Sequence, residues 1–150
     1  MVRLRLRGRL CATLVLLTLG IAGCSGTTAT LTPEMAQRLE AEGTLHRADD
    51  IVLRFTHGIG ARRGGWEDVK ASVVVTRRSI VIHRNAEMLL DVRSGDSREI
   101  SVRRDHERLS LRIGGSRSAK SWSFRPADDP ERWADDMRAT LRAPADTSAG

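Results

Sequence analysis

The stretch S-W-S-F-R-P-A-D-D-P-E-R-W, residues 121–133, decides the fold of this 150-residue chain. Apolar and polar side chains alternate up to Phe124, as in a half-buried strand, and a proline follows. An aspartate cap and a second proline then begin a helix, in which Trp133, Met137 and Leu141 recur on one face. The sequence therefore predicts a last strand followed at once by an amphipathic helix with an apolar stripe to bury.

Six further strands are predicted upstream of this stretch. Short runs rich in valine and isoleucine alternate with polar residues at a period of two, and glycine, arginine, serine and aspartate separate them. The run from Val73 to Val75 is continuous, which favours burial on both faces. The expected strands cover residues 51–56, 69–76, 79–84, 87–92, 99–103, 108–113 and the segment of Trp122 and Phe124.

This order of elements resembles the pleckstrin-homology-like fold, over about residues 50–143. In that family two bent sheets of four and three strands form a partly open barrel, and a C-terminal helix plugs one open end. The resemblance implies a mainly β fold, a seven-stranded antiparallel sandwich or barrel capped by a C-terminal helix. Trp133, Met137 and Leu141 would form the plug, each stabilising the fold by about 1.5–3 kcal/mol. A lipocalin-like barrel and a different helix-capped sandwich are the alternatives.

The first 23 residues are typical of a bacterial export signal. Four arginines and no acidic residue precede an apolar run over residues 10–22, which is shorter than the roughly 20 residues that a membrane span needs. The run ends in Ile21-Ala22-Gly23-Cys24, which resembles the lipobox of bacterial lipoproteins. That resemblance implies cleavage before Cys24 and acyl chains on the new N-terminal cysteine. An ordinary signal peptide that happens to end in a cysteine is the alternative.

The mature chain would then begin with the lipidated cysteine and a flexible tether, residues 24–31. A short helix is expected over residues 32–43, with Met35 and Leu39 on one face, and a disordered tail over residues 144–150. Ser25 follows the cysteine, in place of the aspartate that in enteric bacteria favours the inner membrane. We therefore expect a protein held by its acyl chains in the outer membrane, facing the periplasm.

The charge of the mature chain gives no indication of a nucleic-acid partner. Four of the 25 basic side chains lie within residues 1–23, which leaves 21 basic against 19 acidic side chains and lowers the formal charge from +6 to +2. Arginines alternate with apolar residues along the predicted sheet. This pattern favours a solvated face that discourages edge pairing, with a docking surface for an acidic protein or polymer phosphates as the alternative.

Basic residues around the glycine-rich stretch 58–65 form the candidate ligand site. The stretch lacks the third glycine of a dinucleotide-binding loop and precedes a strand, so it offers no helix N-terminus for a pyrophosphate. In pleckstrin-homology domains that bind phosphoinositides, this loop and its flanking strands supply the phosphate ligands. The resemblance implies candidate binding residues at Arg54, Arg62, Arg63 and Lys70, although the second strand has one basic residue where that family has two. His57 is a further candidate because it begins the loop, and a flexible connection is the alternative to a binding loop.

The sequence contains no recognisable catalytic, metal or cofactor motif. The four histidines lack metal-ligand spacing and are expected at surface or edge positions. The adjacent aspartates at 49–50, 128–129 and 135–136 are interpreted as helix caps or solvated residues. We therefore expect a non-enzymatic binding module for a cell-envelope protein or peptide. Binding of a phospholipid or glycolipid headgroup through the basic loop 57–70 is the alternative.

Overall fold

The computed structural model describes residues 31–57, 65–96, 98–115 and 119–144 of the chain. Its elements are α1 (Pro33–Ala41), β1 (Thr44–His57), β2 (Gly65–Thr76), β3 (Ser79–Arg84), β4 (Glu87–Arg93), β5 (Ile100–Asp105), β6 (Arg108–Ile113), β7 (Lys120–Phe124) and α2 (Pro130–Arg142). Within these described ranges, neither helix has the length and apolar character needed to cross a membrane.

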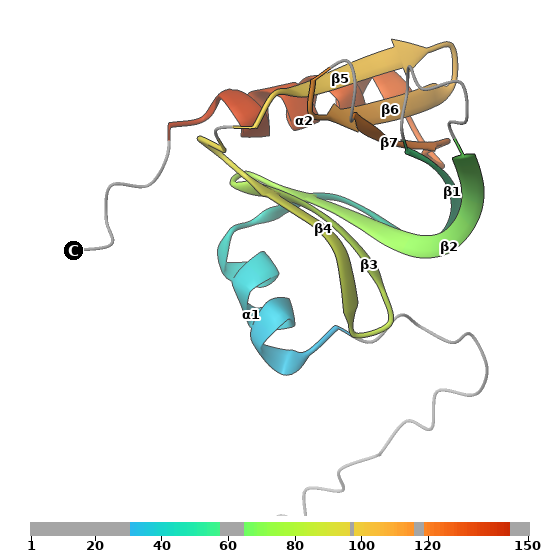
Figure 1. Cartoon of the computed structure of the whole chain (residues 1–150). Helices are drawn as coiled ribbons and strands as arrows, with labels where there is room; N and C mark the ends of the chain where they lie inside the picture. The colour runs from blue at the N-terminus through green and yellow to red at the C-terminus, as the bar shows by residue number, and fades with distance from the viewer. Residues whose placement is uncertain (1–30, 58–64, 97, 116–118, 145–150) are drawn as a thin grey trace, which may run out of the picture.

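The seven strands form one antiparallel sheet in the order β4-β3-β2-β1-β7-β6-β5. Figure 1 shows the sheet curled into a half-barrel, with β2–β4 below, β5–β7 above, and β1 and β2 bending from one layer to the other. The helix α2 lies beside the upper layer and contacts β5 more than any other strand. The predicted fold class is therefore confirmed, and the arrangement is consistent with a pleckstrin-homology-like fold.

The first strand is longer than the sequence indicated. We predicted that it starts at Ile51, whereas β1 starts at Thr44 and pairs with β2 along its whole length. Its register with β2 shifts between Ala48 and Ile51, where Asp50 has a positive φ of 54°. A bulge of this kind bends a strand and interrupts the alternation of side chains. Because of this interruption, the first half of β1 could not be recognised from period-two alternation in the sequence.

The core fills the concave side of the half-barrel. Inward-facing side chains of every strand meet Trp133, Ala134 and Met137 of α2, and Leu141 packs against the same cluster. The Trp133 ring stacks on the His46 ring at 4.6 Å between centroids, and its Nε1 donates a hydrogen bond of 2.6 Å to Asp128. The apolar stripe of α2 therefore closes one end of the half-barrel.

The first helix covers the opposite, convex face of the lower layer. Leu39 packs with Val74 of β2 and Val81 of β3, and Leu31 and Met35 contact the same cluster. Because Val73 and Val75 belong to the main core, the valine run is buried on both faces, as predicted. Figure 1 shows α1 below this layer, on the side away from α2.

A polar network fixes the end of α1. Arg38 donates a 2.8 Å hydrogen bond to Asp91 of β4, and Glu42 accepts hydrogen bonds from the hydroxyls of Thr76 and Ser79. All of these groups are buried or half-buried. The short helix is thus held by packing and by charge-assisted hydrogen bonds to β2, β3 and β4.

Two histidines differ from the expected surface positions. His46 and His83 are buried; His83 lies on β3, which has β2 on one side and β4 on the other, and its Nδ1 is 3.1 Å from the backbone oxygen of Asn85. His46 lies under α2, and its Nε2 is 2.7 Å from the Asp136 carboxylate. Asp136 was interpreted as a cap or a solvated residue, and that interpretation was wrong because the carboxylate joins α2 to β1. His57 and His106 are exposed, as expected.

Candidate binding groove at the open end of the half-barrel

The end of the half-barrel that α2 leaves open contains a groove of about 370 Å³. The helix packs near the start of β1, at His46, and near the end of β7, at Phe124. The groove is lined instead by the end of β1, at Phe55, and by the start of β7, at Lys120 and Trp122. Antiparallel pairing of β1 and β7 therefore places the groove and the helix at opposite ends of the same concave surface.

The floor of the groove is apolar and partly aromatic. The rings of Phe55 and Trp122 stack with 4.2 Å between their centroids, because these residues are directly paired across β1 and β7. The other apolar lining residues come from β2, β4 and β6 and are Val69, Leu89, Leu90 and Ile113. Stacked aromatic rings with aliphatic neighbours form a rigid floor that can bury an apolar ligand group.

Charged side chains of both signs surround this floor: Glu67, Arg84, Glu87, Arg98 and Lys120. Arg84 and Glu87 form an ion pair of 2.7 Å across the β3–β4 hairpin. Glu67 and Lys120 are exposed, and neither forms an ion pair with any residue in the described part of the chain. Among the described residues, the Glu67 carboxylate and the Lys120 ammonium thus have no ion-pair partner and lie beside an aromatic floor.

Arg98 is held in place by Asp96 at the edge of the groove. The Arg98 Nε donates to both Asp96 oxygens, at 2.9 and 3.0 Å, and its Nη2 donates to the backbone oxygen of Asp91 at 3.0 Å. These hydrogen bonds lower the pKa of the Asp96 carboxyl and raise the pKa of the Arg98 guanidinium. The charge of Arg98 is thus largely compensated, and its position is fixed.

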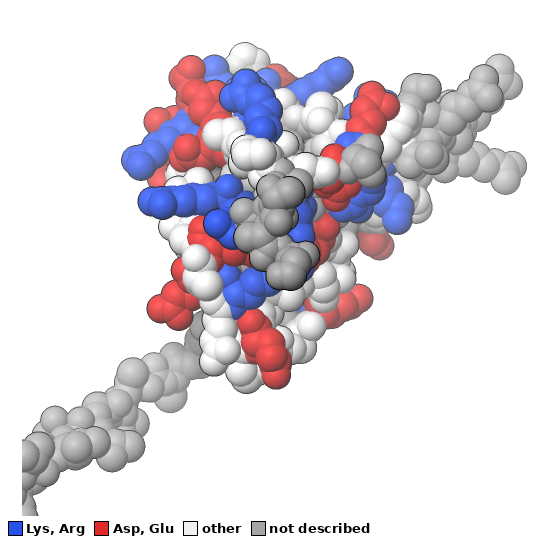
Figure 2. All heavy atoms as spheres, turned by 90° about the vertical axis from the view of Figure 1, so that its left-hand side faces the viewer, with Lys and Arg blue, Asp and Glu red and all other residues white. Residues whose placement is uncertain are grey.

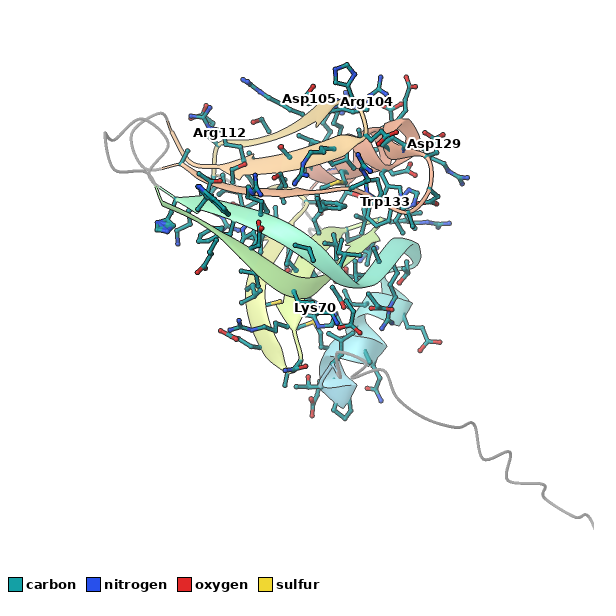
Figure 3. The ribbon with its side chains drawn as sticks, turned by 90° about the vertical axis from the view of Figure 1, so that its right-hand side faces the viewer. Lys70, Arg104, Asp105, Arg112, Asp129 and Trp133 are labelled. Carbon is teal, nitrogen blue, oxygen red and sulfur yellow. The ribbon has the colours of Figure 1, made fainter. Side chains whose placement is uncertain are left out.

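The predicted ligand residues do not converge on one site. Arg54 and Lys70 lie on the convex face, where Arg54 pairs with Asp68 at 3.1 Å and lies 4.4 Å from the Trp66 ring. His57 lies on the concave side, stacked on Phe55 at 5.4 Å. Figure 3 shows Lys70 in the lower part of the sheet, far from the labelled residues of the upper strands.

The remaining predicted residues, Arg62, Arg63 and Cys24, lie outside the described residues. Of the five candidate ligand residues, the described three therefore divide between two faces of the sheet. Successive side chains on a strand point to opposite faces of the sheet. Arg54 and His57 are an odd number of positions apart on β1, so they lie on opposite faces.

Sequence reasoning missed the residues that line the groove. Phe55 and Trp122 were correctly placed in strands, but their direct pairing depends on the sheet order, which brings β1 beside β7. Glu67 lies outside the predicted second strand, since β2 starts at Gly65. Residues 65–69 gave no period-two signal, because Trp66, Glu67 and Asp68 are all exposed.

Comparison with known proteins adds no family assignment. No protein-family model matches the chain, and no curated protein matches it in sequence. Among the described residues, no group of three or more histidine, cysteine, aspartate or glutamate side chains is placed to hold a metal ion. The geometry of the half-barrel and its groove is therefore the basis for a functional proposal.

Proposed function

We propose that this protein is a non-enzymatic, membrane-anchored lipoprotein whose half-barrel binds a cell-envelope protein or peptide in the groove. Acyl chains on Cys24 would hold it in the outer membrane on the periplasmic side. The lipobox-like residues 21–24 and the arginine-rich start of the chain support the anchor. Confinement to the membrane surface would raise the effective concentration of the domain toward envelope partners.

The free charges of the groove are the observation that favours a peptide ligand. Glu67 and Lys120 offer opposite charges without a partner in the described chain, beside the stacked rings of Phe55 and Trp122. A peptide segment carries apolar side chains, charges of both signs and a polar backbone, and so matches every part of this lining. A buried aromatic pocket with a charged rim is also the usual arrangement of a protein-binding hot spot.

Headgroup binding through residues 57–70 has less support. A phosphate ligand needs uncompensated positive charges that point to one place. Arg54 is already paired with Asp68, and His57 lies on the other side of the sheet from Arg54 and Lys70. Figure 2 shows the side of the molecule turned away from the end of β1 and the start of β2, where basic and acidic side chains are interleaved without a large patch of one sign.

A peptide selected from a random-sequence library on the immobilised protein tests the groove. Phe55→Ala should weaken binding of that peptide about tenfold or more, because it removes half of the aromatic floor. Glu67→Lys and Lys120→Glu exchange exposed charges without disturbing the core, and each should also weaken it. Trp66→Ala is the matched control, since this aromatic residue is 62% exposed and lies on the convex face.

Affinities that the groove variants leave unchanged would contradict the proposal, as would a loss of affinity in Trp66→Ala alone. The lipid alternative has its own test. Residues 25–150 should not be retained by anionic phospholipid vesicles, and Arg62→Glu with Arg63→Glu should change nothing. Strong retention that this double substitution abolishes would favour headgroup binding instead.

A further inference from the structure

The outer face of β5, β6 and β7 carries arginines that form no ion pair with any residue the structure describes. We call this surface the arginine face; its outward side chains are Ser101, Arg103, Asp105, Arg108, Ser110, Arg112, Ser121 and Ser123. The charged side chains of this face are three arginines and one aspartate. Within the described chain, none of these three forms an ion pair, in contrast to Arg54 and Arg125, which pair with Asp68 and Glu107.

The strand register places these arginines around one serine. Arg103 is directly opposite Ser110, which lies midway between Arg108 and Arg112 on the neighbouring strand. Strand spacing and rise put Arg103 about 8 Å from each of the other two, measured between Cα atoms. Figure 3 shows Arg112 and Asp105 at opposite ends of the upper layer, so the single carboxylate does not neutralise the end that carries Arg112.

Small hydroxyl side chains fill the positions between the arginines. Ser110 pairs with Ser123, and Arg112 has Ser101 on one side and Ser121 on the other. All four serines are half-buried, and their hydroxyls form no side-chain hydrogen bond with any described residue. Strands usually favour larger β-branched or aromatic residues. Because serine is small, these four side chains project little from the sheet between the arginines.

We propose that the arginine face binds a linear anionic polysaccharide that carries a carboxylate on its sugars. Guanidinium groups bind carboxylates through paired hydrogen bonds, and the free serine hydroxyls can exchange hydrogen bonds with sugar hydroxyls between the charges. The outward positions of β5–β7 hold no aromatic side chain on which a nucleic-acid base could stack. They also hold no apolar anchor of the kind that dominates protein interfaces.

The site is separate from the groove, because inward and outward side chains alternate along the same strands. Val102, Leu109 and Leu111 point into the core, whereas the neighbouring arginines at 103, 108 and 112 point away from it. The domain could therefore hold a protein segment on its concave side and an envelope polysaccharide on its convex side. Failure of either site would leave the other intact, so the two proposals can be tested independently.

Titration of the full chain in detergent micelles with oligogalacturonate, at about 0.15 M salt, tests the proposal. Arg103→Glu with Arg112→Glu should lower the affinity about tenfold or more. Arg77→Glu with Arg132→Glu makes the same change of charge at exposed positions elsewhere and should alter the affinity less than about twofold. Far-UV circular dichroism spectra and urea unfolding midpoints like those of the wild type show that both double variants are folded.

Ser110→Val tests whether the serine hydroxyl contributes to sugar binding, apart from the charge of the arginines. Valine is favoured in strands, and the substitution leaves every arginine in place. It should weaken oligogalacturonate binding about threefold or more and leave binding of polyglutamate, a peptide polyanion, unchanged. The proposal is overturned if the wild type does not bind oligogalacturonate, or if both double variants lose affinity equally. Tighter binding to polyglutamate or to single-stranded DNA than to oligogalacturonate would overturn it as well.

Discussion

Replacing Trp133 with alanine removes the largest buried side chain of the plug. Trp133 is 1% exposed and contacts His46 and Phe124 through its ring. A buried tryptophan takes about 200 Å² out of water, worth about 5 kcal/mol at 25 cal/mol per Å², an upper bound. Measured values for such substitutions are about 3–5 kcal/mol. We expect a loss of this size in unfolding free energy, and a midpoint about 12–20 °C lower.

Urea unfolding followed by far-UV circular dichroism measures this loss, and Trp66→Ala is its control. Trp66 is 62% exposed, so the same substitution should cost less than about 1 kcal/mol there. Trp133→Phe keeps most of the apolar contact but loses the hydrogen bond from Nε1 to Asp128, and should cost about 1–2 kcal/mol. Similar losses in the two alanine variants would refute the plug.

Three further changes test other parts of the structure. Arg38→Ala should cost about 1–3 kcal/mol of unfolding free energy in urea, because the half-buried Asp91 carboxylate loses its closer arginine at 2.8 Å and keeps only Arg93 at 3.7 Å, and replacing Arg38 and Asp91 with apolar residues should recover part of it. Since Arg98 lowers the pKa of Asp96, the stability that this carboxylate contributes is present above about pH 4 and lost as the pH falls through the lowered pKa. Wild type and Asp96→Asn should therefore differ in unfolding free energy at neutral pH and converge as the pH falls through the lowered pKa of Asp96, and a difference that stays constant on acidification would contradict this. Cys24→Ser should abolish labelling by a radioactive or clickable fatty acid and leave the circular dichroism spectrum unchanged, and labelling that persists would exclude this cysteine as the acylation site.

Local patterns were sufficient to predict the strands and the last helix. Trp122 and Phe124 alternate with serines, and Trp133 and Met137 repeat at helical spacing, so the buried side of each element could be read directly. The turn between β2 and β3 falls between the predicted strands 69–76 and 79–84, and the Thr76 hydroxyl accepts hydrogen bonds there from the backbone N–H groups of Arg78 and Ser79. These features depend on neighbours within a few positions of the chain.

The groove could not be predicted in this way, because its parts are distant in the sequence. Phe55 and Trp122 meet only because the sheet order places β7 beside β1. The buried pair of His46 and Asp136 also joins residues that are 90 positions apart, and a bulge at Asp50 concealed the strand that carries His46. Residues paired through tertiary contacts leave no periodic signal, so their roles had to come from the structure.

The proposed function depends on binding of an envelope protein or peptide in the concave groove. Its most direct test is photo-crosslinking in living cells, with benzoylphenylalanine placed either at Leu89 in the groove or at Val52, which is 61% exposed on the convex face. We expect a discrete protein adduct from position 89 and none from position 52. An adduct of equal yield from both positions, or one from position 52 alone, would contradict it.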